Sequence, residues 1–314
     1  MGDDRLGRLC AVVEHGLRTR PEFAHAAHLR VDVGGRTVHD VHLRGPRTAN
    51  VFSVTKTVVA TLVGIGVRDG LVPDLDTPVA DLLGSDAPEL AGQTLRHLLT
   101  MTRGCETGGA WDLDAVEALP SGWVEQACRA PRRAEPGHRF RYDDGAAHLA
   151  SALLGRLAGR PAARYAAERL FAPLGITGWR WRRDPDGVTC GAAHLHLTAD
   201  GLAALGALWL QRGRWRGEQL VDERFAAEMV APHTAGGAPE HRGYGYFTWV
   251  DEHGPSAGGW AGQHVVVVPA AAAVVVTTGD PRFRFGPPHT DELADGWRPA
   301  RDLVAEVLLP ALRP

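Results

Sequence analysis

This sequence is organised around the stretch Val51-Phe52-Ser53-Val54-Thr55-Lys56-Thr57-Val58-Val59-Ala60-Thr61-Leu62. Lys56 is the only lysine among 34 lysine and arginine residues. Arginine keeps its proton in proteins, whereas a desolvated lysine can act as a neutral amine base. Serine is also scarce, and Ser53 stands three residues before Lys56. Positions i and i+3 share one face of a helix, so the hydroxyl and the amine can meet there.

The apolar spacing of this stretch predicts a helix that is buried on nearly all sides. Val54, Val58 and Leu62 recur at helical spacing, and further valines widen the apolar stripe. A serine at the start of such a helix lies at the positive end of the dipole, and apolar surroundings disfavour the charged lysine. Both effects favour an activated nucleophile. The alternative is that Ser53 caps the helix and Lys56 is an ordinary first-turn residue.

The composition is that of a globular protein with a sizeable core. The 314 residues include 44% hydrophobic and 23% charged residues, and the formal net charge is −3. Without a long basic run, nucleic acid is not an expected partner. The first residues are polar, and no apolar run approaches the length of a membrane span, so we expect a soluble, cytoplasmic protein with no membrane partner.

Cysteine and histidine usage favours neither a disulfide framework nor a metal site. The four cysteines lie far apart without a Cys-x-x-Cys pair, which fits reduced thiols. There is no His-Glu-x-x-His, and His194-x-His196 has no carboxylate near it in the sequence. We therefore expect no metal and no cofactor.

The order of predicted elements indicates an α/β protein of the α+β type. The predicted helices cover residues 5–17, the stretch after Ser53, 95–101, 122–129, 148–157, a segment opening at Pro161, 198–210 with Thr198 as N-cap, and 301–312. The predicted strands cover 29–33 and 38–43, joined by a hairpin at Gly34-Gly35, then 244–250, 263–268 and 274–278.

Strands at both ends of the chain predict one antiparallel sheet built from both ends, flanked by helices and interrupted by a mostly helical lobe. We expect a single domain, residues 1–314, with an α/β lobe of about 1–72 plus 190–314 and a helical lobe of about 73–189. A cleft between the lobes is the expected site. Its shape would depend on the loops at 103–135 and 281–299.

Two further stretches can complete a site around Ser53. Tyr142 is one of four tyrosines, and it lies in a loop before a helix, where it can face a cleft and relay protons. Its alternative role is packing. Gly258-Gly259-Trp260 precedes a valine-rich strand, where glycines let a substrate lie close to the backbone. The alternative there is a bulge or a turn.

Together these stretches resemble the serine β-lactamase-like family: class C β-lactamases, D-alanyl-D-alanine peptidases and their esterase and 6-aminohexanoate-dimer-hydrolase relatives. The resemblance covers nearly the whole chain. It rests on the nucleophile motif 52–56, the segments 75–79 and 95–102, Pro136-Gly137 with Tyr142-x-Asp144, Pro173-Leu174-Gly175, and the strand motif 257–263.

The resemblance implies an acyl-enzyme mechanism. Ser53 would be the acylated nucleophile, and Lys56 and Tyr142 would share the acid and base work. The oxyanion hole would consist of the backbone N–H groups of Ser53 and Trp260. The strand Ala257-Gly258-Gly259-Trp260 would bind the substrate, and no cofactor is implied.

Two positions depart from the family pattern. Asp144 replaces the usual asparagine, and a carboxylate there would favour the protonated lysine and weaken the base. Ala257 stands where β-lactamases and peptidases carry Lys or His. Loss of that cation argues against substrates with a carboxylate and for neutral esters or amides.

The expected function is therefore a serine hydrolase, with a small ester or amide as its partner, rather than a true β-lactamase. Two alternatives remain open at this point. One is an acyltransferase of the same fold, which differs only in the acceptor of the acyl group. The other is a binding or sensor protein in which Asp144 weakens the chemistry.

Overall fold

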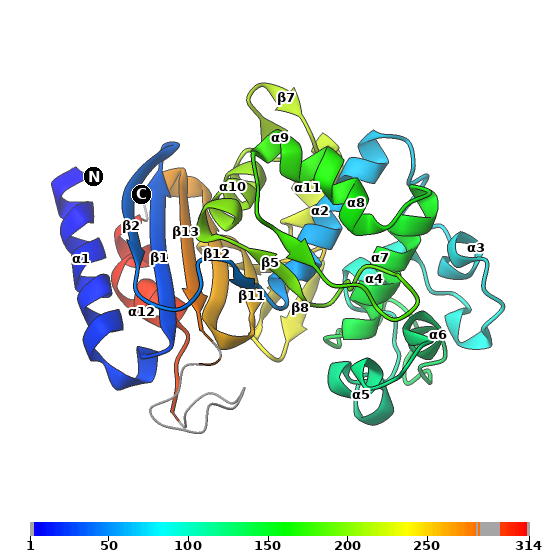
Figure 1. Ribbon diagram of the computed structural model, residues 1–314. Helices are drawn as coiled ribbons and strands as arrows, with labels where there is room; N and C mark the ends of the chain where they lie inside the picture. Colours follow the sequence, from blue (N-terminus) through cyan, green and yellow to red (C-terminus); the bar gives the residue numbers. More distant parts are fainter. Residues whose placement is uncertain (1–2, 281, 283–295, 313–314) are drawn as a thin grey trace.

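An antiparallel sheet of eight strands forms the centre of the molecule in the computed structural model, which describes residues 3–280, 282 and 296–312 (Figure 1). The strand order is β2-β1-β13-β12-β11-β10-β9-β8. The strands are β1 (Ala26–Val33), β2 (Arg36–His42), β8 (Thr234–Gly237), β9 (Arg242–Tyr244), β10 (Trp249–Asp251), β11 (Gly254–Gly259), β12 (Gln263–Val268) and β13 (Ala273–Gly279). Because β1 pairs directly with β13, the prediction of one sheet built from both ends is confirmed.

The hairpin between β1 and β2 has the predicted turn. Gly34 and Gly35 both have positive φ, 58° and 76°. A two-residue turn with two such residues matches the twist of the flanking strands, and glycine adopts it without a steric cost. The turn therefore sets the register in which Val33 lies opposite Arg36, and an irregularity between Val31 and Asp32 then shifts the register so that Val31 lies opposite His39.

Helices cover both faces of the sheet (Figure 1). Helix α1 (Asp3–Thr19) and helix α12 (Ala300–Val307) lie on one face, where Leu6, Val13 and Val304 pack with the valines of β12 and β13. The other face carries α2 (Val54–Arg68) and α10 (Ala199–Leu210), which begins after the predicted N-cap Thr198. The final predicted helix ends at Val307, and a 3₁₀ turn, Leu309–Leu312, follows it.

Helix α2 runs through the core, as its sequence predicts. Every residue from Val54 to Gly66 is buried. A Cβ on Gly64 would lie 2.4 Å from the ring of Phe225, so the glycine permits the close approach of α11 (Glu223–Met229). The helix is thereby held from all sides, and its N-terminus, where Ser53 stands, has a fixed position.

The remaining helices lie beside α2, away from the sheet (Figure 1). They are α3 (Val79–Leu83), α4 (Leu95–Leu99), α5 (Leu113–Glu117), α6 (Trp123–Cys128), α7 (Asp144–Leu157), α8 (Ala162–Ala166), a π-helical turn (Ala167–Phe171) and α9 (Ala172–Leu174). Helix α7 begins four residues before the predicted start at His148. The cause is Asp143, which caps α7 by accepting a hydrogen bond from the N–H of Ala146.

The prediction of one strand over residues 244–250 is wrong. The segment is the end of β9, a turn and the start of β10. At the turn, Phe247 has a φ of 47°, its N–H donates to the carbonyl of Leu99, and its carbonyl accepts from the hydroxyl of Thr57. These partners are distant in sequence, so local periodicity does not reveal the turn.

The glycine-rich stretch before β12 is a separate strand, β11, rather than the entry to the valine strand. The turn Trp260–Gly262 joins β11 to β12, and Ala261 in this turn has a φ of 60°. Short strands missed by the sequence are β3 (Ala49–Asn50), β4 (Arg180–Trp181), β5 (Leu195–Leu197), β6 (Arg214–Trp215) and β7 (Glu218–Gln219). Among the described residues, no helix is long and apolar enough to cross a membrane.

Candidate active site

Ser53 stands immediately before the first residue of α2, after a constrained turn. Phe52 has a φ of 45°, a region that residues with a side chain seldom adopt. Its N–H donates to Oδ1 of Asn50 at 2.9 Å, which fixes the turn. The Ser53 side chain makes no capping hydrogen bond. The alternative in which Ser53 only caps the helix is therefore wrong, and its hydroxyl is available for another role.

Lys56 lies one turn into α2, and its side chain is 1% exposed. Nζ contacts three acceptors: Oγ of Ser53 at 2.8 Å, the carbonyl oxygen of Ala192 at 2.8 Å, and Oδ1 of Asp144 at 2.7 Å. An ammonium group has three N–H donors, so these three partners satisfy it completely. The helical spacing predicted the contact with Ser53, and the family resemblance implied Asp144 nearby, but the sequence gave no signal for Ala192.

The surroundings favour the charged form of Lys56. Burial lowers the pKa of Lys56, but the charge of Asp144 and the interactions with Tyr142 outweigh it, so the pKa is raised above its usual value. Burial raises the pKa of Tyr142, although the charge of Lys56 opposes this shift. At neutral pH the site therefore holds a lysine ammonium beside a neutral phenol.

Tyr142 closes the site on the side of β10. Its ring centroid lies 4.9 Å from Nζ of Lys56, and its interactions with Lys56 and Ser53 oppose the rise in the Tyr142 pKa that burial causes. The ring stacks on Trp249 with an interplanar angle of 4° and a centroid distance of 5.8 Å. Trp249 is a contact that the sequence did not indicate. The stack holds the phenol where it can exchange a proton with Ser53 or Lys56.

The end of β11 passes directly over Ser53. A Cβ on Gly259 would lie 2.4 Å from the carbonyl of Val51 and 3.2 Å from the backbone nitrogen of Ser53, so only glycine fits there. Trp260, which is 41% exposed, contacts the ring of Phe52 edge-on at 5.2 Å. The strand end thus brings the backbone of residues 259 and 260 next to Ser53.

Ala257 and Gly258 lie farther along β11. Ala257 is fully buried in the core cluster that contains α2. A Cβ on Gly258 would lie 1.9 Å from Oε1 of Glu240, so a carboxylate group occupies that side of the strand. Neither residue places a cation beside Ser53.

A cavity adjoins Lys56 on the side of the helices. Asp144 and Ala192, which both contact Nζ of Lys56, form part of its wall. Its other lining residues are Arg103, Trp111, Asp112, Leu113, Val116, Glu117, Trp123, Ala127, Gly145, His148, Cys190, Gly191 and Ala193. Several of them come from the 103–135 loop region, as expected. Most of the second predicted segment, 281–299, lies outside the described residues.

The charged groups of this cavity have partners within the protein. Glu117 contacts Nε2 of His194 at 2.6 Å and Nη1 of Arg182 at 2.7 Å. Burial raises the pKa of Glu117, but His194 and Arg182 outweigh it, so the pKa is lowered and Glu117 carries a negative charge. Burial raises the pKa of Cys190 to about 12, which makes it an unreactive thiol.

Metal ligation finds no support among the residues that the structure describes. They contain no group of three or more His, Cys, Asp or Glu side chains arranged to hold a metal ion. His194 contacts Glu117, as described above. The cysteines are buried and unpaired.

An eight-stranded antiparallel sheet between helical layers, with a Ser-x-x-Lys at the start of the buried central helix, defines the β-lactamase/transpeptidase fold. The chain belongs to the Beta-lactamase family, whose family model matches residues 34–295. No curated protein matches the sequence.

Solved structures share this fold at low sequence identity. A putative 6-aminohexanoate-dimer hydrolase from Bacillus anthracis has a TM-score of 0.79 and 18% identity over 95% of this chain and 81% of that chain. EstCE1, a hydrolase with promiscuous acyltransferase activity, has a TM-score of 0.71 and 18% identity over 99% of this chain and 98% of that chain. The octameric penicillin-binding protein homologue from Pyrococcus abyssi has a TM-score of 0.74 and 17% identity over 98% of this chain and 78% of that chain.

Proposed function

We propose that this protein is a serine hydrolase that acts through an acyl-enzyme on a small neutral ester or amide. The observation that carries the proposal is the contact of 2.8 Å between Nζ of Lys56 and Oγ of Ser53 in a buried site that Tyr142 closes. A nucleophile within hydrogen-bond reach of a base, with a third group beside both, is the arrangement that covalent catalysis requires.

In the first step Oγ of Ser53 attacks the carbonyl carbon of the substrate, and its proton passes to Lys56 or Tyr142. The negative charge on the carbonyl oxygen is stabilised by the N–H groups of Ser53 and Trp260, which the close approach of Gly259 supports. The leaving group takes up a proton as the C–O or C–N bond breaks, and the acyl group stays on Ser53. Water then attacks the ester and releases the acid.

Lys56 has to lose a proton before it can accept one from Ser53. All three of its N–H donors have partners in the resting site, and Asp144 at 2.7 Å is the carboxylate among them. The reaction therefore becomes faster as the pH rises and the amine becomes neutral.

The charges around the site favour a neutral substrate. The cation Lys56 is paired with Asp144, and Glu117 adds a second carboxylate to the cavity. The tryptophans and aliphatic side chains of the cavity wall suit an apolar acyl group. A substrate carboxylate would meet repulsion there.

The direct test is acylation of Ser53. A fluorophosphonate, or a p-nitrophenyl ester trapped by rapid acid quench, should add one acyl or phosphonyl group to the intact protein. The Ser53→Ala variant should show no such mass increase, and peptide mapping should place the group on Ser53. An unmodified wild-type protein over the pH range 7 to 10 would overturn the proposal.

A second candidate is a binding or sensor protein, which the complete saturation of the Lys56 ammonium favours. In that case the wild type is inert, and Asp144→Asn gains esterase activity. Acyl transfer is separated from hydrolysis in the same assay by adding alcohols or amines and measuring transfer products. The acyltransferase alternative predicts that these products exceed the acid released.

A further inference from the structure

Two segments that are distant in sequence run side by side next to the site. The N–H of Gly137 donates to the carbonyl of Thr102 at 2.8 Å, and the N–H of Arg141 donates to the carbonyl of Met101 at 2.9 Å. Nη1 of Arg141 also contacts Oε1 of Glu106 at 2.8 Å. The loop that carries Tyr142 is thus attached to the turn at 101–106.

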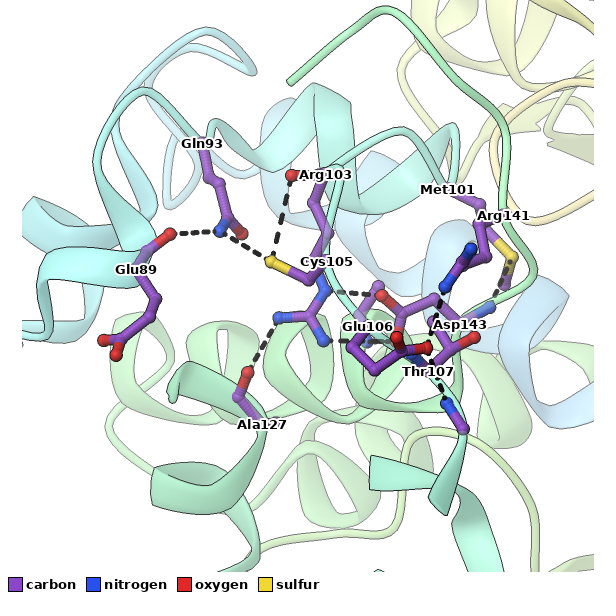
Figure 2. Close-up of polar contacts among 12 residues, drawn as sticks. Glu89, Gln93, Met101, Arg103, Cys105, Glu106, Thr107, Ala127, Arg141 and Asp143 are labelled. Carbon is purple, nitrogen blue, oxygen red and sulfur yellow. Dashed lines mark hydrogen bonds and ion pairs between the residues drawn. The ribbon is translucent and has the colours of Figure 1, made fainter. Parts of the chain in front are cut away.

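An ion pair between buried side chains completes this attachment (Figure 2). Nε of Arg103 donates to Oδ2 of Asp143, and Nη2 donates to Oδ1 at 3.3 Å. The side chains are only 2% and 4% exposed. The remaining guanidinium nitrogen, Nη1, donates to the carbonyl of Ala127 at 2.7 Å, at the end of α6. A two-point contact of this kind fixes the carboxylate in orientation as well as in position.

Asp143 lies between the two residues that contact Lys56. Its backbone is extended, with φ −144° and ψ 104°. Its carboxylate contacts Arg103, whereas Tyr142 and Asp144 on either side of it contact Lys56. Oδ1 of Asp143 also caps α7 by accepting from the N–H of Ala146 at 2.9 Å. Fixing Asp143 on one side of the chain therefore directs its two neighbours to the other side, toward Lys56.

We propose that the buried Arg103–Asp143 ion pair is a positioning device, which holds Tyr142 and Asp144 in contact with Lys56. Arg103 and Asp143 touch no reacting atom in this scheme, so they are positioning residues. The catalytic consequence rests on the proposed function, whereas the effect on the surroundings of Lys56 does not depend on it.

The test compares Arg103→Gln, Asp143→Asn and the double variant. Each single variant leaves one buried charge without its partner, so Tm should fall by roughly 5 to 15 °C. The double variant removes both charges and keeps an N-cap acceptor at position 143, so most of this loss should be recovered. A slower acylation that persists in the double variant would then not be a consequence of lost stability.

The first readout is the rate of Ser53 acylation. In the double variant it should stay about 10- to 100-fold below the wild type although Tm recovers, because small displacements of reacting groups cost this much. Recovery of both Tm and acylation would show a merely structural ion pair and overturn the proposal.

The second readout is the ¹³Cε signal of protein labelled with ¹³C-lysine, which is a single signal because Lys56 is the only lysine. In the wild type it should keep its charged position up to pH 10, whereas in the double variant it should begin to titrate below that pH. An identical titration in both proteins would overturn the proposal even if the wild type acylates nothing. If the wild type is not acylated but the titration of Lys56 differs between the wild type and the double variant, only the proposed function would be rejected.

Asp69→Asn is the matched control. Asp69 follows the last residue of α2 and is mostly buried with ion pairs to Arg68 and Arg169. It lies 13 residues after Lys56, roughly 20 Å along the helix axis. This variant should lower Tm but leave the acylation rate and the ¹³Cε titration unchanged.

Discussion

Nζ of Lys56 lies 2.7 Å from Oδ1 of Asp144 and 2.8 Å from Oγ of Ser53, so the Asp144 carboxylate and the Ser53 hydroxyl share one ammonium group. The attraction of Asp144 stabilises the charged amine, whereas the proposed acylation of Ser53 needs the neutral amine. The pH dependence of acylation therefore reports on this contact.

Asp144→Asn should move the alkaline limb of the acylation profile to lower pH. Burial lowers the pKa of Lys56 and the charge of Asp144 is the largest influence that raises it, so removing that charge lowers the pKa. Acylation at pH 8 should rise about tenfold for each pH unit by which the limb moves. Stopped-flow bursts with p-nitrophenyl acetate between pH 6 and 10 measure it.

A slower Asp144→Asn variant at every pH would contradict this expectation, since it would make Asp144 the proton acceptor of Lys56. Asp144→Ala is the companion variant, because it removes the carboxylate without adding an amide. Both variants should lose about 2 kcal/mol of unfolding free energy, because a buried ammonium loses its counter-ion.

Gly259→Ala should reduce acylation by more than about 100-fold. The added Cβ would meet the carbonyl of Val51 and approach the nitrogen of Ser53, so β11 has to move away from the nucleophile. Single-turnover rates with a fluorophosphonate measure the effect. Gly258→Ala is the control, because its Cβ would meet the carboxylate of Glu240 instead. Equal losses of acylation in the two variants would reject the assignment of the Gly259–Trp260 backbone to the oxyanion hole.

Esters with a neutral acyl chain should react about 10- to 100-fold faster than esters of equal length that end in a carboxylate. The reason is that Asp144 and Glu117 both line the cavity beside Lys56. The p-nitrophenyl esters of pentanoate and of glutarate form a matched pair, and kcat/KM is the quantity to compare. Faster turnover of the glutarate ester would show that an anion site exists.

The lowered pKa of Asp69 predicts that the folded protein loses stability in acid. Burial raises the pKa of Asp69, but hydrogen bonds from Arg169, Arg68 and Tyr165 outweigh it and lower the pKa from 3.8 to about 2. A lowered folded-state pKa means that the stabilisation is present above pH 4 and is lost as the pH falls toward 2. The contribution is about 2 kcal/mol.

Urea unfolding at pH 6, 4 and 2 measures this contribution. The wild type should lose more unfolding free energy than Asp69→Asn between pH 4 and 2. Equal losses in the two proteins would show that Asp69 has an ordinary pKa in the folded state.

Local signals were sufficient for the nucleophile helix and for the hairpin. The separation of Ser53 and Lys56 fixes their relative position within one helical turn, and Gly34-Gly35 specifies its own turn. The contact of Ser53 and Lys56 with Tyr142 and Asp144 was inferred from the family resemblance. The structure places these four side chains together. The division into two lobes stays a prediction.

Contacts between distant segments could not be derived in this way. Asp143 and Arg103 are 40 positions apart, and nothing in the local pattern of either indicates the other. The turn at Phe247 likewise depends on Leu99 and Thr57, so an alternating pattern was interpreted as one strand. In both cases the partner is specified by the assembled fold and not by neighbouring residues.

The four chain segments that surround Ser53 have a practical consequence. The start of α2, the loop at 142–144, the carbonyl of Ala192 and the end of β11 converge only when the sheet and the helices beside it have both assembled. On the proposed function, covalent titration of Ser53 would count the correctly assembled molecules in a preparation. It would measure refolding yield and storage lifetime without any knowledge of the natural substrate.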